Sequence, residues 1–341
     1  MNLYNNIRNG LEQGSESVIL ISDISADHGE CEQLSKSTDL YRISEEERYH
    51  ILRLGKPVML KKDERTLFAE PFYTKERILI FGGGHVALPL VKFAKMIGFY
   101  VVIYDDRKEF ANRERFPLAD EVHTGSYKEC IEAMKPQASD YIVVITRGHS
   151  QDTLCIQELL KYPEPVYTGL IGSRKRTKVV FQKFLDEGQD PQRIQAINSP
   201  IGLNIGAQTT EEIGISIMAE IIQRKRMESM DSTVVNRSDM DVNALELLCD
   251  ARPPFALATI MKAHGSVPRK EGAKMLIFPD GSIQGTIGGG GVEAAIIKKG
   301  MELAGTGKYC IYHVDLNGED AMAQGMVCGG SLEILLEDTE T

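Results

Sequence analysis

The chain has 341 residues, of which 42% are hydrophobic and 26% charged, a composition typical of a globular protein with room for two domains. A formal net charge of −10 argues against a nucleic-acid partner, which would need a basic surface, and gives no support for binding to acidic membranes. No run approaches about 18 apolar residues, the N-terminus has no signal-peptide pattern, and six cysteines without CxxC spacing favour reduced thiols, so we expect a cytoplasmic protein without a membrane span.

The first 72 residues predict a short α+β segment. Residues 10–24 follow the order helix end, polar break and strand. Residues 45–63 follow the order helix, Gly-Lys and strand, and residues 66–72 form a further apolar run. None of these stretches carries a recognisable binding or catalytic motif.

A glycine motif follows the next predicted strand. The apolar, β-prone run 78–81 stops at Gly82, and Gly82, Gly84 and Ala87 fit the pattern G-x-G-x-x-G/A. In that pattern the first glycine allows a tight turn, the second lets a phosphate approach the backbone, and the small residue lets a helix pack on the strand. The candidate cofactor-binding residues of this loop are Gly82, Gly83, Gly84 and His85.

A helix and a second strand continue the pattern. Apolar residues recur at helical spacing over 85–97, and the strand-like run 100–104 leads into Asp105. An acid about 20 residues after the glycines can accept a hydrogen bond from a ribose 2′-OH, so Asp105 is a candidate for NAD(P) binding. Arg107 leaves the choice between NAD and NADP open, and the alternative is that Asp105 only caps a turn.

Two further strands, at 121–123 and 140–146, extend the predicted parallel sheet. Thr146 and His149 follow the second of them, and ligands bind at the carboxyl ends of strands in such sheets. Both residues are therefore candidate binding residues, and His149 could be catalytic. The alternative for His149 is a histidine that caps the next helix.

The stretch 167–185 predicts strand, tight turn and helix. Ser173 is a candidate N-cap, and Arg174 begins a basic run where a helix N-terminus could help to bind an anion. A solvated basic surface is the alternative. A long helix follows near 210–226, so we place a Rossmann-type domain at 76–228 and a polar interdomain linker at 229–241.

The last hundred residues, 242–338, predict a smaller α+β domain. Its hairpin at the Pro-Asp-Gly turn precedes four glycines, Gly288, Gly289, Gly290 and Gly291, and a helix that starts near Val292. Exposed backbone N–H groups at a helix start favour anions, so these glycines are candidate cofactor-binding residues. Glu293 lies in the first turn of that helix, where it could bind a ligand or simply favour the helix dipole.

A cysteine stands in the final loop of this domain. Cys328 precedes two glycines and the last predicted strand, 331–338. An exposed loop cysteine can be an activated thiolate, and a buried inert thiol is the alternative.

The combined motifs resemble the XdhC/CoxI family. ILIFGGGHVALPL, YTGLIGSRKR and SPIGLNIGAQTTEEI are similar to its nucleotide-binding domain, and HGSVPRKEGAKML, GTIGGGGVEAAI and MVCGGSLEILLE to its other domain. The resemblance covers residues 66–340. It implies an accessory protein, typically a homodimer, that binds the molybdenum–pterin cofactor, supports sulfuration of the metal and delivers the cofactor to an apo molybdenum hydroxylase of the xanthine dehydrogenase type. A cysteine desulfurase is an implied further partner.

This sequence departs from the family pattern in two ways. The domain with the Cys-Gly-Gly motif comes last, whereas it usually comes first. Gly291 stands where many members have a cysteine, which leaves Cys328 as the thiol of this domain that the resemblance assigns to metal or sulfur. Soft sulfur ligands suit that chemistry. The resemblance thus implies a catalytic and metal-binding Cys328, with Glu293 as a second catalytic candidate.

The N-terminal segment resembles the C-terminal domain in pattern. Residues 10–24 match 247–261, and 45–63 match 298–316. We interpret residues 1–72 as a degenerate internal copy without a site of its own, and a different strand order in the two regions would refute this interpretation. The alternative is chance similarity of short amphipathic elements.

Two functions are therefore expected. The first is molybdenum-cofactor maturation and delivery. The second is an NAD(P)-dependent oxidoreductase, for which His149 is the available acid or base. A purely structural component of a xanthine dehydrogenase is a third possibility.

Overall fold

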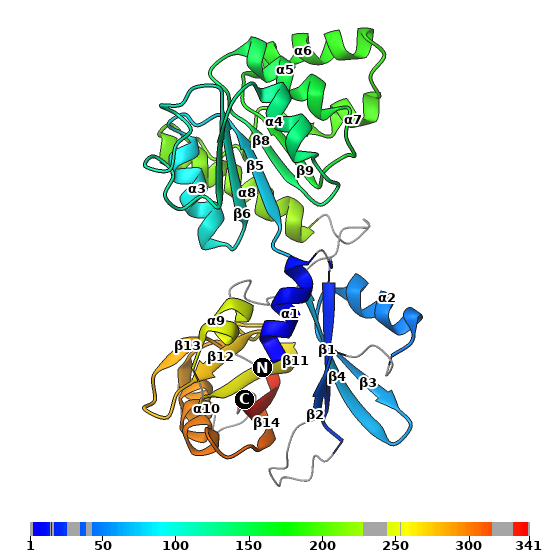
Figure 1. Ribbon diagram of the computed structural model, residues 1–341, viewed down its shortest axis with the longest axis vertical. Coiled ribbons are helices and arrows are strands. Elements are labelled where there is room, and N and C mark those ends of the chain that lie inside the picture. The colour runs from blue at the N-terminus through cyan, green and yellow to red at the C-terminus, as the bar shows by residue number, and fades with distance from the viewer. Residues whose placement is uncertain are drawn as a thin grey trace. The chain divides into compact units, whose positions relative to one another are not determined.

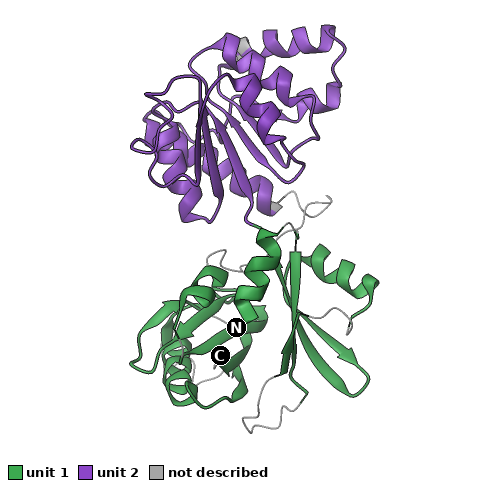
Figure 2. Ribbon diagram, viewed as in Figure 1, with its two compact units in different colours: residues 1–74, 235–341 green, residues 75–234 purple. Residues whose placement is uncertain are grey.

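The computed structural model describes residues 3–13, 15, 17–25, 35–38, 43–227, 244–252, 254–315 and 330–339. The chain forms two compact units, residues 75–234 and residues 1–74 together with 235–341 (Figures 1 and 2). The N-terminal segment and the C-terminal domain thus fold together as one unit, unit 1, and the central region forms unit 2. The predicted linker 229–241 lies outside the described residues.

Unit 2 is a six-stranded, entirely parallel sheet with the order β10-β9-β8-β5-β6-β7. Its strands are β5 (Arg77–Phe81), β6 (Tyr100–Asp105), β7 (Glu121–Thr124), β8 (Tyr141–Val144), β9 (Tyr167–Leu170) and β10 (Ile197–Asn198). Its helices are α3 (Ala87–Met96), α4 (Tyr127–Met134), α5 (His149–Leu159), α6 (Arg174–Asp186), α7 (Pro191–Gln195) and α8 (Thr210–Met227). The chain runs outward from β5 in one direction and from β8 in the other, so the strand order reverses between these two strands. Ligands bind at such a reversal in open α/β sheets.

Helices cover both faces of this sheet, because its strands are apolar on both sides. Alternate side chains of β5 show this: Ile78 and Ile80 pack in the cluster that includes α3 and α8, whereas Leu79 and Phe81 pack in the cluster that includes α4 and α5. Strands buried on both faces have continuous apolar sequences.

Unit 1 contains two antiparallel sheets. The first has the order β2-β1-β4-β3 and the second β13-β12-β11-β15-β14. The N-terminal elements are α1 (Leu3–Glu12), β1 (Ser17–Asp23), β2 (Ser35–Ser37), α2 (Glu45–Leu54), β3 (Val58–Lys62) and β4 (Arg65–Tyr73). The C-terminal elements are α9 (Ala244–Asp250), β11 (Ala256–Gly265), β12 (Lys274–Ile277), β13 (Ile283–Gly285), α10 (Gly290–Leu303), β14 (Tyr309–Asp315) and β15 (Gly330–Asp338).

The two sheets of unit 1 pack face to face, with one helix on each outer face (Figure 1). Along β1, Ile19 and Ile21 face the cluster that contains Ile51 of α2, and Leu20 faces the second sheet. Along β11, Ala258 faces the cluster of α10, and Leu257 faces the first sheet. Because side chains alternate between the two faces of a strand, each sheet packs one face on its own helix and the other face on the other sheet.

The structure confirms the predicted fold class, a Rossmann-type domain with a smaller α+β domain and a short N-terminal α+β segment. The bounds of the predicted elements differ from the observed ones by one or two residues at several strand and helix ends. Helix α10 begins at Gly290 and not near Val292, because the glycines themselves take up the first turn. Among the described residues, none of the helices has the length and apolar character needed to cross a membrane.

Candidate functional site

The glycine loop after β5 is shaped by two close backbone contacts. A Cβ on Gly82 would lie 2.3 Å from the carbonyl oxygen of Ile145, and a Cβ on Gly83 would lie 2.0 Å from that of Phe110. A Cβ on Gly84 would meet nothing within 4 Å. Gly82 and Gly83 are therefore required by packing within the protein, and Gly84 is the open position at which a ligand could approach the backbone.

Helix α3 begins directly after this loop. Val86 precedes its first residue and gives no side-chain cap, and His85 beside it is exposed. The backbone N–H groups of a first helical turn have no partners within the helix, and they attract anions when no side chain caps them. The loop and the helix start thus offer an anion site at the strand-order reversal.

Asp105 is fully buried and holds the glycine loop in place. Its carboxylate accepts hydrogen bonds from the backbone N–H of Gly83 at 2.8 Å and from the Nε of Arg107 at 2.8 Å, and also from the Arg107 backbone. Burial by itself would raise the pKa of this carboxyl, but the Arg107 side chain and the Gly83 N–H outweigh burial and lower it. In this structure Asp105 bonds to the protein, and its predicted contact with a ribose stays a prediction.

A polar cluster lies at the carboxyl end of β8. The Thr146 hydroxyl donates to Oδ1 of Asp152 at 2.6 Å, and Nδ1 of His149 lies 3.9 Å from Oδ2 of the same carboxylate. Asp152 is buried, which raises its pKa, whereas His149 is about half exposed. His149 is the first residue of α5 and Gly148 is its N-cap, so the alternative of a capping histidine is wrong.

Asp152 was not among the residues singled out from the sequence. In sequence it resembles any acidic residue in the first turn of a helix, where an acid is common because it favours the dipole. The spacing His-x-x-Asp was the available indication, since residues three apart share a face of a helix.

The other predicted residues of unit 2 lie at the same sheet edge, where β9 ends. Ser173 occupies the N-cap position of α6 with extended backbone angles, as predicted, but its side chain makes no capping hydrogen bond. Arg174 is the first residue of that helix. A further ion pair, Arg147 Nη2 to Asp106 Oδ2 at 2.8 Å, joins the ends of β8 and β6 on either side of β5.

A second glycine loop lies in unit 1, before α10. The Oε2 atom of Glu293 accepts hydrogen bonds from the Thr286 hydroxyl at 2.5 Å, the Ile287 N–H at 3.1 Å and the Gly289 N–H at 3.0 Å. Gly289 and Gly290 have positive φ angles, and a Cβ on either would meet nothing within 4 Å. Glu293 therefore fixes the loop, and the two glycines leave its backbone open.

The loop 264–269 contacts both neighbouring motifs of unit 1. A Cβ on Gly288 would lie 2.9 Å from Cγ of Pro268, and a Cβ on Gly330 would lie 2.4 Å from the carbonyl oxygen of His264. The structure thus brings together HGSVPR, the glycine cluster and the second glycine of the Cys-Gly-Gly motif. Cys328 itself lies outside the described residues. Across the described residues, no group of three or more His, Cys, Asp or Glu side chains is arranged to hold a metal ion.

Replacing Glu293 with alanine should loosen this loop. Removing an acceptor that serves three donors is expected to destabilise unit 1 by about 2 kcal/mol. The Gly289 amide should also exchange its hydrogen faster, which hydrogen-exchange mass spectrometry can measure. Glu293→Gln keeps one acceptor oxygen and serves as the control with near-normal protection. Unchanged exchange in Glu293→Ala would contradict the assigned role.

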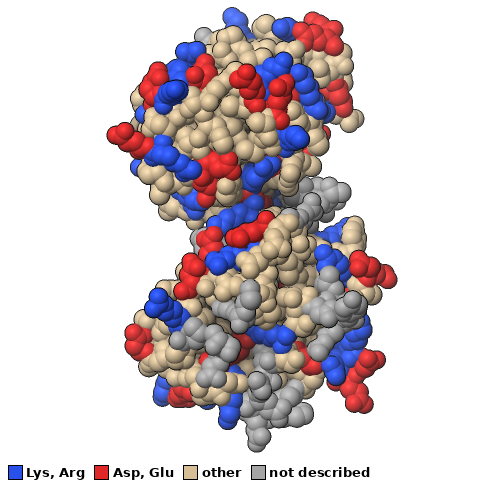
Figure 3. Space-filling view, in the orientation of Figure 1, with Lys and Arg blue, Asp and Glu red and all other residues tan. Residues whose placement is uncertain are grey.

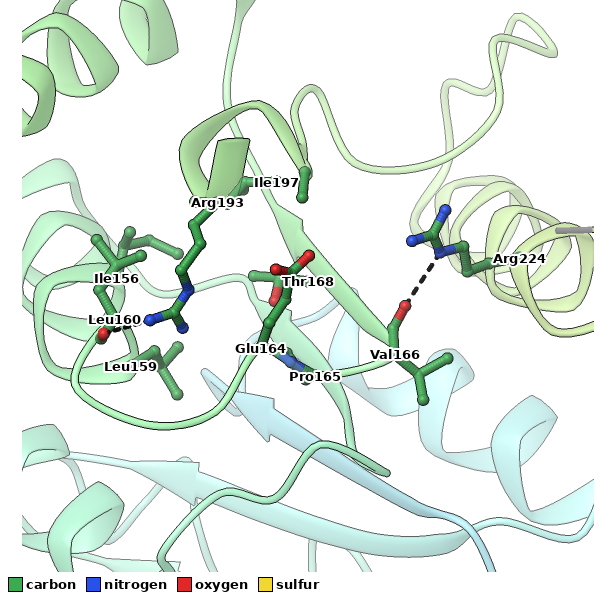
Figure 4. A pocket seen from close by; sticks show the side chains of 11 residues that line it. Ile156, Leu159, Leu160, Glu164, Pro165, Val166, Thr168, Arg193, Ile197 and Arg224 are labelled. Atoms are coloured by element: carbon green, nitrogen blue, oxygen red, sulfur yellow. Dashed lines mark hydrogen bonds between the residues drawn. The ribbon is translucent and has the colours of Figure 1, made fainter. Parts of the chain in front are cut away.

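A pocket lies at the opposite edge of the unit 2 sheet, near the amino ends of β9 and β10 (Figure 4). Arg193 donates to the carbonyl oxygens of Leu160 and Tyr162, and Nε of Arg224 donates to that of Val166. The guanidinium groups therefore satisfy backbone carbonyl oxygens just after α5 and just before β9. None of the residues predicted to bind a ligand lines this pocket.

Charged side chains are mixed over the face seen in Figure 3, where Lys and Arg alternate with Asp and Glu on both units.

The fold and the loops define a two-domain α/β protein of the Rossmann class with a second, glycine-loop domain. Residues 78–221 match the XdhC Rossmann domain, and residues 248–315 match the XdhC and CoxI family. The chain belongs to the XdhC/CoxI family, which confirms the resemblance inferred from its motifs.

Two curated proteins are similar to this chain. An uncharacterized protein of Escherichia coli strain K12, YqeB, is 30% identical over 152 residues, which cover 44% of this chain and 28% of that protein. A probable xanthine dehydrogenase subunit of Bacillus subtilis strain 168 is 34% identical over 162 residues, which cover 47% of each. The chain thus spans less than half the length of these relatives.

A solved structure is similar as well. The crystal structure of a xanthine dehydrogenase from Bacillus halodurans is 27% identical to this chain, with a TM-score of 0.53. The similarity covers 67% of this chain and 64% of that one.

Proposed function

We propose that this protein binds the molybdenum–pterin cofactor, supports sulfuration of its metal and delivers it to an apo molybdenum hydroxylase of the xanthine dehydrogenase type. The observation that carries the proposal is the convergence in unit 1 of the loop 264–269, the open glycines 289–290 and Gly330, two residues after Cys328. Membership of the XdhC/CoxI family and the similarity to a probable xanthine dehydrogenase component support it.

The residues present fit such a cargo. Gly289 and Gly290 leave open space at the start of α10, a helix of 14 residues, and its N-cap Gly289 has no side-chain cap. A phosphate could therefore bind the backbone N–H groups of the first turn after Gly289, whose own N–H donates to Glu293. The cargo brings a metal with a preference for sulfur ligands, which the Cys328 thiolate would supply. A cysteine desulfurase would provide sulfur, and a homodimer is part of the same proposal.

Activation of apo-hydroxylase tests the role of Cys328. Cys328→Ala should abolish activation while leaving thermal unfolding unchanged. Cys249→Ala is the matched control, because burial raises the pKa of the Cys249 thiol and keeps it neutral. Full activation by Cys328→Ala would overturn the assignment.

A second candidate is an NAD(P)-dependent oxidoreductase in unit 2. The contact between His149 and Asp152 favours it, since a buried carboxylate can orient a histidine that takes up a proton. Titration with NADH and NADPH, followed by cofactor fluorescence, tests this candidate. The candidate would be supported if the wild type and the His149→Ala variant both bound one of these nucleotides saturably and only the variant had lost hydride transfer. No binding of either nucleotide would exclude it.

A further inference from the structure

The two sheets of unit 1 have the same topology. Unit 1 has an N-terminal half, residues 3–73, and a C-terminal half, residues 244–338. In both halves the chain order is helix, strand, strand, helix, strand, strand, if the extra edge strand β13 of the C-terminal half is left out. The sheet order β2-β1-β4-β3 corresponds to β12-β11-β15-β14, and all of these neighbours are antiparallel. Strand order is a stricter criterion than strand count, because a four-stranded sheet can be connected in many ways.

The register of the central strands is also the same. Leu20 pairs with Glu70 in the first sheet, and Leu257 pairs with Glu337 in the second. Two residues further along each first strand, Ser22 pairs with Lys36, and Thr259 pairs with Lys274. Glu70 of the first half therefore corresponds to Glu337 of the second, and Lys36 corresponds to Lys274.

These four charged residues form two ion pairs that cross between the halves. Lys36 of the first half contacts Glu337 of the second, and Lys274 of the second half contacts Glu70 of the first. The Lys274 and Glu70 side chains are each 1% exposed, and the Glu337 side chain is 3% exposed. Crossed pairs of equivalent residues are the pattern that a two-fold axis produces in a symmetric dimer.

The apolar contacts between the sheets follow the same symmetry. One buried cluster contains both members of two equivalent pairs, Phe68 with Leu335 and Ile24 with Met261. The cluster near α1 and α9 contains the equivalent residues Leu20 and Leu257. Matching residues thus lie in the same buried cluster between the two sheets.

The connections differ where the ligand loops would be. Strands β3 and β4 are joined by two residues, whereas β14 and β15 are joined by residues 316–329, which include Cys328. Between β2 and α2 there are seven residues, and between β12 and α10 there are twelve, residues 278–289, which include β13 and the first two clustered glycines. The N-terminal half therefore keeps the interface and has shorter links in place of these two connections, whereas its link between β1 and β2, residues 24–34, is longer than residues 266–273 between β11 and β12.

We infer that unit 1 is an intramolecular pseudo-dimer, in which residues 3–73 occupy the face of the C-terminal domain that would otherwise accept a second copy of that domain. The C-terminal half carries both members of the crossed pair, Lys274 and Glu337, so its interface is self-complementary. The N-terminal half supplies the matching surface, and its sequence has neither the four-glycine run nor the Cys-Gly-Gly motif. This inference does not depend on which ligand the protein binds.

Charge reversal in the full chain tests the crossed pairing. Lys274→Glu should raise the unfolding equilibrium constant about a hundredfold or more, because it places two carboxylates together in a buried site. The cross-half double change K274E/E70K should lower the unfolding equilibrium constant at least tenfold relative to Lys274→Glu. The second cross-half double change, K36E/E337K, should lower it by as much relative to Lys36→Glu. The within-half double change K274E/E337K should recover nothing, since each reversed residue then faces a like charge. Recovery in this last variant, or in only one cross-half pair, would overturn the inference.

An exchange of equivalent core residues provides a test that keeps every charge. Phe68→Leu leaves space in the cluster and Leu335→Phe overfills it, so each alone should raise the unfolding equilibrium constant about tenfold. The double change F68L/L335F conserves volume across the pseudo-axis and should restore most of the stability. F72L/L335F is the matched control, because Phe72 lies in a different cluster, and it should restore none. Failure of F68L/L335F to do better than this control would contradict the equivalence.

Discussion

Replacing Gly83 with alanine is expected to destabilise unit 2 by about 3 kcal/mol or more. The new Cβ would lie 2.0 Å from the carbonyl oxygen of Phe110 and 3.3 Å from the Phe116 ring. Because the nearest obstacle is backbone, relief requires the segment after β6 to move away from the glycine loop. Thermal or denaturant unfolding of the purified protein measures the loss.

Gly84→Ala is the matched control for this prediction. The same methyl group one residue later meets nothing within 4 Å, so the stability of unit 2 should change by less than about 1 kcal/mol. If a phosphate approaches the loop here, Gly84→Ala should weaken its binding about tenfold or more without unfolding the protein. Equal stability losses in the two variants would show that the close contact at Gly83 does not decide the outcome.

Replacing Asp105 with asparagine is expected to destabilise unit 2 by about 2–3 kcal/mol at neutral pH. The change removes the charge from a buried group that accepts from Gly83 and Arg107. Arg107 is 22% exposed and lies 3.6 Å from Asp106, so part of its charge remains compensated. Asp106→Asn affects a carboxylate that is 19% exposed, lies 3.6 Å from Arg107 and pairs with the half-exposed Arg147, and it should cost less than Asp105→Asn.

The effect of Asp105 should depend on pH with a defined sign. The folded protein lowers the pKa of this carboxyl below its ordinary value of 3.8. Its contribution to stability is therefore fully present above that value and is lost as the pH falls through the lowered pKa. Unfolding measured between pH 7 and pH 2 should show wild type and Asp105→Asn converging in acid. A difference in stability that stays constant down to pH 2 would contradict the proposed ion pair.

The sequence predicted the Rossmann unit well because local patterns determine it. Each element of this unit has a recognisable local sequence pattern: a continuous apolar run for a strand buried on both sides, glycines for a turn, and helical periodicity for an amphipathic helix. The order of these patterns limits the topology to a few choices. The role of Gly83 was not predictable in this way. It depends on Phe110, 27 residues later, in a segment whose sequence has no periodicity that would place it against the loop.

Asp152 and the charged residues of unit 1 escaped prediction for a related reason. Lys274 and Glu337 stand on strands among apolar residues, and a sequence pattern cannot show that each has an oppositely charged partner more than 200 residues away. Short-range patterns indicated similar elements in the two halves, whereas their strand order and the pairing of their charges needed coordinates. Asp152 similarly gained its importance from Thr146 at the end of a strand.

The covalent link between the two halves of unit 1 changes how their interface responds to dilution. Two separate chains that share such a face come apart when the protein concentration falls below their dissociation constant. Residues 17–73 and 256–338 belong to one chain, so the face that supports the loops 264–269 and 288–291 is held at a fixed effective concentration. A protein present in few copies per cell would therefore keep this surface assembled in every molecule.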